Sequence, residues 1–455
     1  MSHTFDLSPS QRARIFRHTI ECLEQYYAHT ADRPVSPELD AEAIIREVEK
    51  HDFIQPLSPE QAVDQVIDGL SRYAVHTPHP KYFGLFNPRA NLGGILADLI
   101  TATLNPQMAA WSHAPYAAEV ENYLVRAFGE RFGYDPATAD GVFASGGAEA
   151  NLTALLCALN HAFPDFARWG VRGLANQPVL YCSAEAHHSV NKAARMVGLG
   201  YAAVRSIPVD KHLRMDLPVL EQTIAADQAA GHQPFLLIGT AGTTGGGAID
   251  SLTSLADIAQ RHDLWFHVDA AYGGAAILDP QLQPFLAGIE RSDSITFDAH
   301  KWLSVPMGAS MFLTSHRDIL GQTFRITTDY MPKDAGELTI TDPFTHSVQW
   351  SRRFIGLKVY LALLIYGWDG YREVIAGQTA VGAYLKRRLG EDGWLLMNDT
   401  PFPIACFTDP YRRDYPACAP GLVQKIVRSR RSWISVYPVQ GVPCLRACIT
   451  NYLTG

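Results

Sequence analysis

The sequence predicts an α/β protein built on a mainly parallel β-sheet with helices on both faces, and three observations support this fold class. Between residues ~90 and ~315, short and nearly continuous apolar runs alternate with helical patterns, as is typical of parallel strands buried on both faces. Of the 455 residues, 47% are hydrophobic and 18% are charged, so a large core can be buried. The chain is about three times as long as a typical domain, so smaller units should flank the sheet.

The N-terminal part of the chain is expected to be helical. Ser8-Pro9, Ser36-Pro37 and Ser58-Pro59 each place a capping hydroxyl before a proline that suits the first helical position. The amphipathic segments between these steps are too few to build a core on their own. We therefore expect residues 1–78 to form a helical arm that docks on the rest of the chain or holds two subunits together.

Residues 79–350 are expected to form the large domain, because the apolar runs of the sheet fall there. In sheets of this kind, ligands bind at the carboxyl ends of the strands. Helical periodicity returns near residue 351 and then mixes with short strands, which predicts a smaller α+β domain over residues 351–455. The expected strands of the sheet are Gly141–Ala144, Pro178–Cys182, Ala203–Val209, Phe235–Thr240, Trp265–Val268, Ser294–Phe297 and Ala309–Thr314.

Charge and composition exclude several classes of partner. The 38 Lys and Arg residues against 46 Asp and Glu residues give a net charge of −8, which does not suit nucleic acid. No apolar run approaches the roughly 18 residues of a membrane span, and the first residues lack a secretion signal, so we expect a cytoplasmic protein. The seven cysteines contain no CxxC pair, so neither a disulfide framework nor a metal site is expected.

Lysine is scarce in this chain, with nine residues in all, and Lys301 differs from the others in its context. It follows the expected strand Ser294–Phe297 at the edge where ligands bind. A lysine that is desolvated there can act as an amine nucleophile. A structural ion pair explains the same segment equally well.

Three further segments carry candidate functional residues. Asp269 closes the strand before a run of small residues, where a carboxylate needs a cation or hydrogen-bond donors; a protonated pyridine nitrogen, a helix cap and a buried arginine all remain possible partners. Gly147 and Ala148 begin a helix after a glycine-containing turn, and bare amides at such a position bind anions. His187 follows another strand, where a lone histidine is more often structural than catalytic.

Taken together, these residues describe a pocket for pyridoxal 5'-phosphate at one edge of the sheet. Gly147 and Ala148 would bind the phosphate, Asp269 would face the pyridine nitrogen, and Lys301 would react with the aldehyde. The combination is more specific than any one of its parts.

The sequence resembles the group II pyridoxal-phosphate-dependent amino acid decarboxylases, the family of aromatic-amino-acid, glutamate and diaminobutyrate decarboxylases. The resemblance spans nearly the whole chain in the family's order. It implies the fold of PLP-dependent transferases of type I, with a seven-stranded sheet, and a homodimer whose active site lies at the subunit interface. The matching segments are HPKYFGLFNP (79–88), AWSHAPYAAEVE (110–121), SGGAEAN (145–151), EAHHSV (185–190), GTAGTTGGGAID (239–250), HVDAAYGGAA (267–276), DSITFDAHKW (293–302) and SRRFIGLK (351–358).

The resemblance also implies a role for each matching residue. Lys301 would form the Schiff base with the cofactor, Asp269 would keep the ring nitrogen protonated, and His187 would stack on the ring. Tyr330, in the segment that looks like the family's mobile loop, would protonate the carbanion. Gly147, Ala148, Ser294 and His300 would bind the phosphate; Thr244, Ala271 and Asp298 would line the cofactor; Phe83, Leu85, Phe86, Gln107 and Arg446 would form the substrate pocket.

Two of these pocket positions depart from the family's aromatic branch, because Leu85 stands where that branch tends to have tyrosine and Gln107 replaces a hydrophobic residue. The pocket should therefore be wider or more polar, and the substrate's side chain is left open. Arg446 either assists in orienting the substrate or forms a structural ion pair.

The implied activity is that of an L-amino acid α-decarboxylase, which converts an amino acid to its amine and CO₂. One alternative is a decarboxylating aldehyde synthase or another Cα lyase, and the presence of Tyr330 and His187 argues against it. Another is a catalytically silent dimeric binding protein, which the presence of Lys301 and Asp269 argues against.

Overall fold

The computed structural model describes residues 5–326, 340–413 and 415–455. Its large sheet has seven strands within these residues, in the order β1-β7-β6-β5-β4-β2-β3. β7 is antiparallel to both of its neighbours, and the other pairs are parallel. Each strand lies within two residues of its expected position, so the predicted fold class is confirmed. The strands are β1 (Asp140–Ala144), β2 (Pro178–Ser183), β3 (Val204–Ile207), β4 (Gln233–Thr240), β5 (Trp265–Asp269), β6 (Ser294–Asp298) and β7 (Ser310–Thr314).

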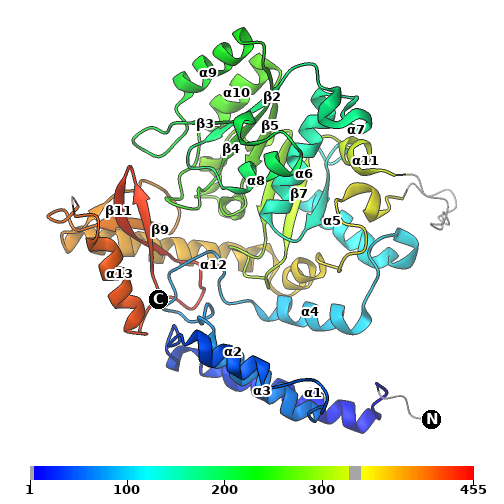
Figure 1. Cartoon of the computed structure of the whole chain (residues 1–455), viewed down its shortest axis with the longest axis vertical. Helices are drawn as coiled ribbons and strands as arrows, with labels where there is room; N and C mark the ends of the chain where they lie inside the picture. The colour runs from blue at the N-terminus through cyan, green and yellow to red at the C-terminus, as the bar shows by residue number, and fades with distance from the viewer. Residues whose placement is uncertain (1–4, 327–339, 414) are drawn as a thin grey trace.

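Helices cover both faces of this sheet, because successive side chains of a strand point to opposite faces. In β1, Val142 packs in one hydrophobic cluster and Phe143 in the other. On the Val142 face lie α6 (Gly147–Ala162), α8 (Ser189–Met196) and α11 (Ile319–Phe324), while α5 (Pro115–Arg131), α9 (Leu217–Ala229) and α10 (Leu252–His262) cover the other face. The short helix α7 (Phe166–Trp169) follows α6 (Figure 1).

A second, smaller sheet lies in the C-terminal part of the chain. Its strands are antiparallel and follow the order β10-β11-β9-β8. α12 (Leu357–Glu391) leads into it and also packs along α4 (Leu92–Leu104). The remaining elements are β8 (Leu395–Leu396), β9 (Ile404–Thr408), α13 (Cys418–Arg428), β10 (Ser435–Val439) and β11 (Val442–Cys448).

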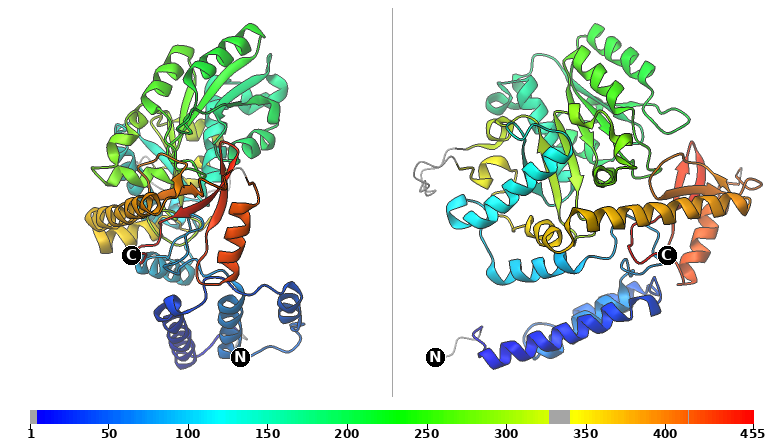
Figure 2. Two further views of the ribbon diagram at one scale, coloured as in Figure 1. Left: turned by 90° about the vertical axis from the view of Figure 1, so that its left-hand side faces the viewer. Right: turned by 180° about the vertical axis from the view of Figure 1, so that it is seen from behind.

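The first part of the chain forms the helices α1 (Pro9–Ala28), α2 (Ala41–Glu49) and α3 (Pro59–Tyr73), which project from the rest of the chain (Figure 2). Polar pairs join α1 to α3: Arg14 bonds Glu60 at 2.7 Å and His18 bonds Asp64 at 2.7 Å. From the first pair to the second, the residue number rises by one helical turn on both helices, so the two helices run parallel. We refer to residues 5–78 as the arm.

Two of the three expected helix starts in the arm are correct. Ser8 and Ser58 each cap a helix, and each forms a capping box with the glutamine three residues later. The expectation at Ser36 is wrong, because α2 begins at Ala41 with Asp40 as its N-cap. Ser36 is instead buried, and its hydroxyl donates to the carbonyl of Val427 at 3.0 Å. A long-range contact thus uses the hydroxyl that a helix cap would need.

Among the residues that the structure describes, no helix is both long and apolar enough to cross a membrane. All seven cysteines are described, and each of them is a free thiol.

Candidate active site

A cavity of about 180 Å³ lies at the carboxyl edge of the large sheet. It is formed where β4, β5 and β6 end and where α6 begins. Lys301 and Asp269, which the sequence analysis placed at opposite ends of one cofactor ring, both line it. The full lining is Gly147, Ala148, Asn151, His187, Thr240, Gly242, Thr244, Asp269, Ala271, Tyr272, Asp298 and Lys301.

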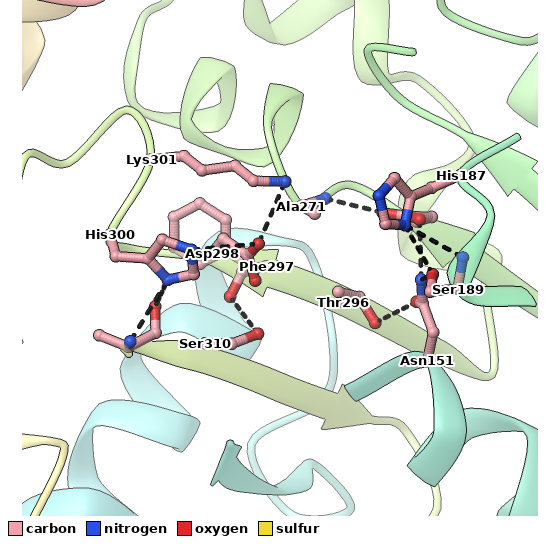
Figure 3. A network of polar contacts seen from close by, with 12 residues as sticks. Asn151, His187, Ser189, Ala271, Thr296, Phe297, Asp298, His300, Lys301 and Ser310 are labelled. Atoms are coloured by element: carbon pink, nitrogen blue, oxygen red, sulfur yellow. Dashed lines mark hydrogen bonds and ion pairs between the residues drawn. The ribbon is translucent and has the colours of Figure 1, made fainter. Parts of the chain in front are cut away.

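Lys301 enters the cavity from the turn that follows β6. Its Nζ lies 3.1 Å from Oδ2 of Asp298, and its side chain is 20% exposed. The same carboxylate has a second oxygen, Oδ1, that is buried without a hydrogen-bond partner among the described atoms. Figure 3 shows the amine directed toward Asp298. The structure therefore shows the ion pair at this lysine, and its role as a reactive amine stays a prediction.

Asp269 closes β5, the strand next to β6, and also lines the cavity. Its Oδ1 accepts the backbone N–H of Ala271 at 3.1 Å, and its Oδ2 accepts an amide hydrogen of Asn151 at 2.9 Å. No arginine or lysine is paired with this carboxylate within the described part of the chain, which leaves its negative charge available to a cationic ligand. The carboxylate is also fixed in direction, because each oxygen has its own donor.

The start of α6 lies at the cavity, where the sequence predicts an anion-binding site. Gly147 and Ala148 line the cavity, and the preceding residue, Gly146, offers no side-chain cap, so the first amides of the helix remain available. A Cβ on Gly147 would approach Oδ2 of Asp298 to 3.0 Å, so a side chain at this position would reduce the space at the start of α6. The hydroxyls of Thr240 and Tyr272 are buried without a partner among the described atoms. These free polar groups fit a ligand such as pyridoxal phosphate.

His187 lines the cavity from the segment that follows the carboxyl end of β2. Its Nδ1 lies 2.8 Å from the hydroxyl of Ser189 and accepts the backbone N–H of that residue at 3.2 Å. Burial lowers the pKa of His187, and the positive charge of Lys301 lowers it further against the opposing effect of Asp269. A neutral ring with its hydrogen on Nε2 follows from these contacts.

The expectation that Ser294 binds the phosphate is wrong. Ser294 begins β6, whereas the cavity lies at the other end of that strand, roughly 13 Å away at 3.3 Å per residue. Its hydroxyl accepts from the indole N–H of Trp265 at 2.8 Å and contacts Nδ1 of His267 at 2.9 Å. The side chain is fully buried in that contact.

His300 lies beside the cavity but is not part of its lining. Its Nδ1 contacts the carbonyl of Ala309 at 2.9 Å, and its Nε2 lies 3.7 Å from Asp298. Its contact with a phosphate stays a prediction. Tyr330, the expected proton donor, lies outside the described residues.

The five expected substrate-pocket residues occupy different surroundings. Phe86 is next to the site: its ring stacks on Tyr272 at 4.0 Å, and Nζ of Lys301 lies 5.7 Å from the ring centroid. Phe83 is partly buried and packs against the hydrophobic cluster of the small sheet, and its place in the substrate pocket stays a prediction. Leu85 is 51% exposed. Gln107 bonds Ser351 and the backbone of Ala109.

Arg446 is buried beneath this site, and its guanidinium lies 5.2 Å from the Phe86 ring centroid. It donates to the carbonyls of Gly84, Thr244 and Gly245. No carboxylate pairs with it among the residues described, so the ion-pair alternative is wrong. Arg446 instead joins β11 to the loop that carries Thr244.

Sequence reasoning missed several residues of the cavity, namely Asn151, Thr240, Gly242 and Tyr272. Asn151 had a detectable signal: it lies one helical turn after Gly147, so its side chain projects from the side of α6 on which Gly147 lies. His267 and Thr296, which contact Asn151, are polar residues in strands whose residues are all buried. A buried polar residue of this kind needs a partner, and that rule could have indicated the network.

The expectation of no metal site overlooked one group of possible ligands. His18 and Cys22 lie one turn apart on α1 and approach Asp64 of α3, with their ligand atoms within 4.8 Å of one another. The contact between His18 and Asp64 at 2.7 Å already explains why these side chains lie close together.

Comparisons with known proteins agree with this geometry. The family described as the pyridoxal-dependent decarboxylase conserved domain matches residues 45–408. The chain is 28% identical over 413 residues to an aromatic-L-amino-acid decarboxylase of Bacillus atrophaeus, covering 90% of this chain and 83% of that protein. It is 30% identical over 381 residues to a cysteine sulfinic acid decarboxylase of Mus musculus, covering 80% of this chain and 77% of that protein.

The fold agrees as well. The chain superposes on the crystal structure of mouse CSAD with a TM-score of 0.92 and 27% identity, covering 98% of this chain and 96% of that one. The family match covers most of the chain and includes every described residue that lines the cavity. The chain therefore belongs to the pyridoxal-dependent decarboxylase family, and it is a pyridoxal-phosphate-dependent amino acid decarboxylase.

Proposed function

We propose that this decarboxylase releases the α-carboxylate of an L-amino acid as CO₂ and returns the amine, with Lys301, Asp269, His187 and Tyr330 as its catalytic residues. The observation that carries the proposal is the shared cavity of Lys301 and Asp269 at the carboxyl edge of the sheet. An amine and a carboxylate without a cationic partner in one pocket suit a ring that carries both an aldehyde and a basic nitrogen.

Bound pyridoxal phosphate supplies a cationic ring that accepts the electron pair left on Cα when CO₂ departs. Asp269 holds the proton at the ring nitrogen, because both of its oxygens are fixed by Ala271 and Asn151. Gly147 and Ala148 bind the phosphate through the start of α6. Lys301 holds the cofactor through Nζ, and Asp298 keeps that amine in the cavity by a contact of 3.1 Å.

His187 and Tyr330 complete the proposed chemistry. His187, neutral because burial lowers its pKa, covers the ring and excludes water from one face. The site must also hold the bond from Cα to the carboxylate perpendicular to the ring, so that this bond breaks rather than the bond to hydrogen. Tyr330 then delivers a proton to Cα, which makes the product an amine and not an aldehyde.

A homodimer is part of the proposal, with residues 1–78 as the dimerisation arm, 79–350 as the cofactor domain and 351–455 as the small domain. Its support is the set of apolar side chains that the arm and α4 expose, since large exposed apolar patches mark interfaces. The exposed side chains include Phe16, Ile20, Leu23, Val66 and Leu70 on the arm and Leu92, Ile95, Leu96, Leu99, Ile100 and Leu104 on α4. A cytoplasmic location is proposed as well, in keeping with seven free thiols.

The test combines cofactor linkage with substrate turnover. Purified protein with pyridoxal phosphate should absorb in the visible range, and borohydride should fix the cofactor on Lys301, as found by mass spectrometry of its peptide. Lys301→Ala should lose the linkage, whereas Lys192→Ala, a control on α8, should keep it. An undiminished linkage in Lys301→Ala would move the nucleophile elsewhere.

CO₂ release should then be measured with the standard amino acids, diaminobutyrate, DOPA and cysteine sulfinate. We expect one class of substrate, aromatic, acidic or diamino, to exceed the others. Tyr330→Phe should shift the product from amine toward aldehyde with uptake of oxygen, and an unchanged amine yield would refute the role of Tyr330. A protein that binds the cofactor but releases no CO₂ from any of these compounds would overturn the proposed reaction.

A further inference from the structure

A network of buried polar side chains adjoins the cofactor cavity, and Asn151 contacts four of its other members. Figure 3 shows Asn151 beside Ser189 and Thr296. Asn151 projects from α6 and is 4% exposed. Its neighbours are His267 on β5, Thr296 on β6 and Ser189 at the start of α8. All of these side chains are buried. Buried polar groups of this kind are costly unless each one is hydrogen-bonded, so the pattern of bonds is informative.

Every hydrogen-bonding position of the Asn151 amide is used. Nδ2 donates to Asp269 Oδ2 at 2.9 Å and to Ser189 Oγ at 2.9 Å. Oδ1 accepts from Thr296 Oγ1 at 2.8 Å and contacts Nε2 of His267 at 3.1 Å. A side-chain amide has two hydrogens and two lone pairs, so none is left over.

The contacts of His187 with Ser189 determine which groups are donors and which are acceptors in this part of the network. The backbone N–H of Ser189 points at Nδ1 of His187, so this nitrogen has no hydrogen. The Ser189 hydroxyl must then donate to Nδ1, and its oxygen is free to accept from Asn151. The amide nitrogen of Asn151 therefore faces Ser189, as it also must to reach the carboxylate of Asp269.

The orientation of the Asn151 amide also determines the donors and acceptors around His267. Because Oδ1 of Asn151 can only accept, the hydrogen of His267 lies on Nε2. Nδ1 of His267 is then an acceptor for the hydroxyl of Ser294 at 2.9 Å, and that hydroxyl accepts from the indole of Trp265 at 2.8 Å. An indole N–H only donates and a carboxylate only accepts, so the whole chain of bonds runs in one direction, from Trp265 to Asp269.

We propose that Asn151 is a positioning residue that aims the Asp269 carboxylate at the ring nitrogen of the cofactor and holds His267 as the neutral Nε2–H tautomer. This inference rests on the proposed function, since it takes pyridoxal phosphate as the ligand of Asp269. Asn151 does not touch the reacting bond. It acts by supplying the one side-chain donor that Asp269 has among the described residues.

The charge of the network supports this role. Burial lowers the pKa of His267 to about 4, against the opposing effect of Asp269. His267 is therefore neutral at the pH of the cell, and it provides no positive charge for Asp269. The counter-charge must come from the ligand, which favours a ring that is protonated on its nitrogen.

The test uses the full chain and two readouts. Asn151→Leu keeps the volume but removes every polar contact, so we expect the Kd for pyridoxal phosphate, measured by absorbance titration, to rise at least 10-fold. Asn160→Leu, the same exchange further along α6, is the matched control and should stay within about 2-fold, because Asn160 bonds only the carbonyl of Leu156 among the described contacts. Equal affinity of Asn151→Leu and wild type would overturn the inference.

The second readout is the 15N NMR spectrum of histidine-labelled protein, with His267 identified by its loss in His267→Gln. We expect wild-type His267 to carry its hydrogen on Nε2 and to stay uncharged at pH 5.5, and we expect Asn151→Leu to lose this signature. A residue that only fills space would not alter it. A hydrogen on Nδ1, or a charged ring at pH 5.5, overturns the inference even if the variant fails to fold. If the wild type binds no pyridoxal phosphate at all, the proposed function fails instead.

Discussion

Every residue of β5 and β6 is buried, whereas none of the residues of α1, α2 and α3 is, although the structure describes all five elements in full. The strands carry polar side chains that do not lie on the protein surface, among them His267, Asp269 and Thr296. The arm carries apolar side chains that do, among them Phe16 and Val66. Apolar side chains are usually buried and polar side chains are usually exposed. In each region the residues that depart from this rule are the ones that point to function, namely a ligand site in the core and an interface on the arm.

The two regions also differ in what stabilises them. The large sheet is covered on both faces and has a core of its own. A few contacts join the arm to the rest of its chain. Among them, the backbone N–H of Val35 donates to the carbonyl of Arg430 at 2.8 Å, and the hydroxyl of Ser36 donates to the carbonyl of Val427. Helices without a core are marginal in water. The arm therefore depends on a surface outside itself, and changes in the two regions should have different consequences.

The largest effect is expected from the buried carboxylate of the core. Asp269→Asn should lower the rate of CO₂ release by about 10²–10³-fold, because an amide does not stabilise a proton on the ring nitrogen. Asp279→Asn is the control: it replaces another buried carboxylate, which accepts the backbone N–H of Gln281, and should leave the rate within a few-fold. Comparable losses in both variants would assign the effect to folding.

Removal of the arm tests the other region. A chain without residues 1–75 should still bury the core of the large sheet, but we expect it to elute as a monomer and to lose at least 10-fold in activity. Light scattering after size-exclusion chromatography and a CO₂-release assay measure the two effects. A stable and active dimer without the arm would show that the exposed apolar face is not the interface.

The buried histidine of the core should make stability depend on pH. Burial lowers the pKa of His267 from 6.5 to about 4 in the folded state, so the unfolded chain takes up a proton first as the pH falls. The stabilisation is complete above pH 6.5 and is lost between pH 6.5 and 4, at a cost on the order of 3 kcal/mol.

Urea unfolding at several pH values measures this loss. His267→Gln should flatten the decline between pH 6.5 and 4, although its stability at pH 7 will be lower because the network is broken. His29→Gln, which replaces an exposed histidine of the arm, should leave the decline unchanged. A wild-type decline equal to that of His267→Gln would contradict the assignment to His267.

The smallest effect is expected within the arm itself. Ser58→Ala removes the cap of α3 and should weaken that helix by about 1 kcal/mol, which hydrogen exchange of the first α3 amides would detect as faster exchange. Ser36→Ala should leave those amides unchanged and instead loosen the contact with Val427. Identical exchange patterns in the two variants would mean that the two Ser-Pro steps act alike.

The sequence by itself was sufficient for the fold and for several residues that line the cavity. The strands of the large sheet were predicted to within two residues, because parallel strands buried on both faces are continuous apolar runs. Lys301, Asp269 and Gly147 were found because each stands at a strand end or helix start, and the carboxyl ends of parallel strands meet at one edge. These features are local, so they can be detected along the chain.

The tertiary structure decided what depends on contacts between distant segments. Ser36 looks like a helix cap, yet its hydroxyl bonds a carbonyl nearly 400 residues later. Ser294 lies in a segment that matches the family, yet its position at the start of β6 directs its hydroxyl into the network of Asn151 and His267 and away from the cavity. A hydroxyl or an amide can bond many partners with similar energy, so the partner that it bonds is determined by which segments the fold brings together.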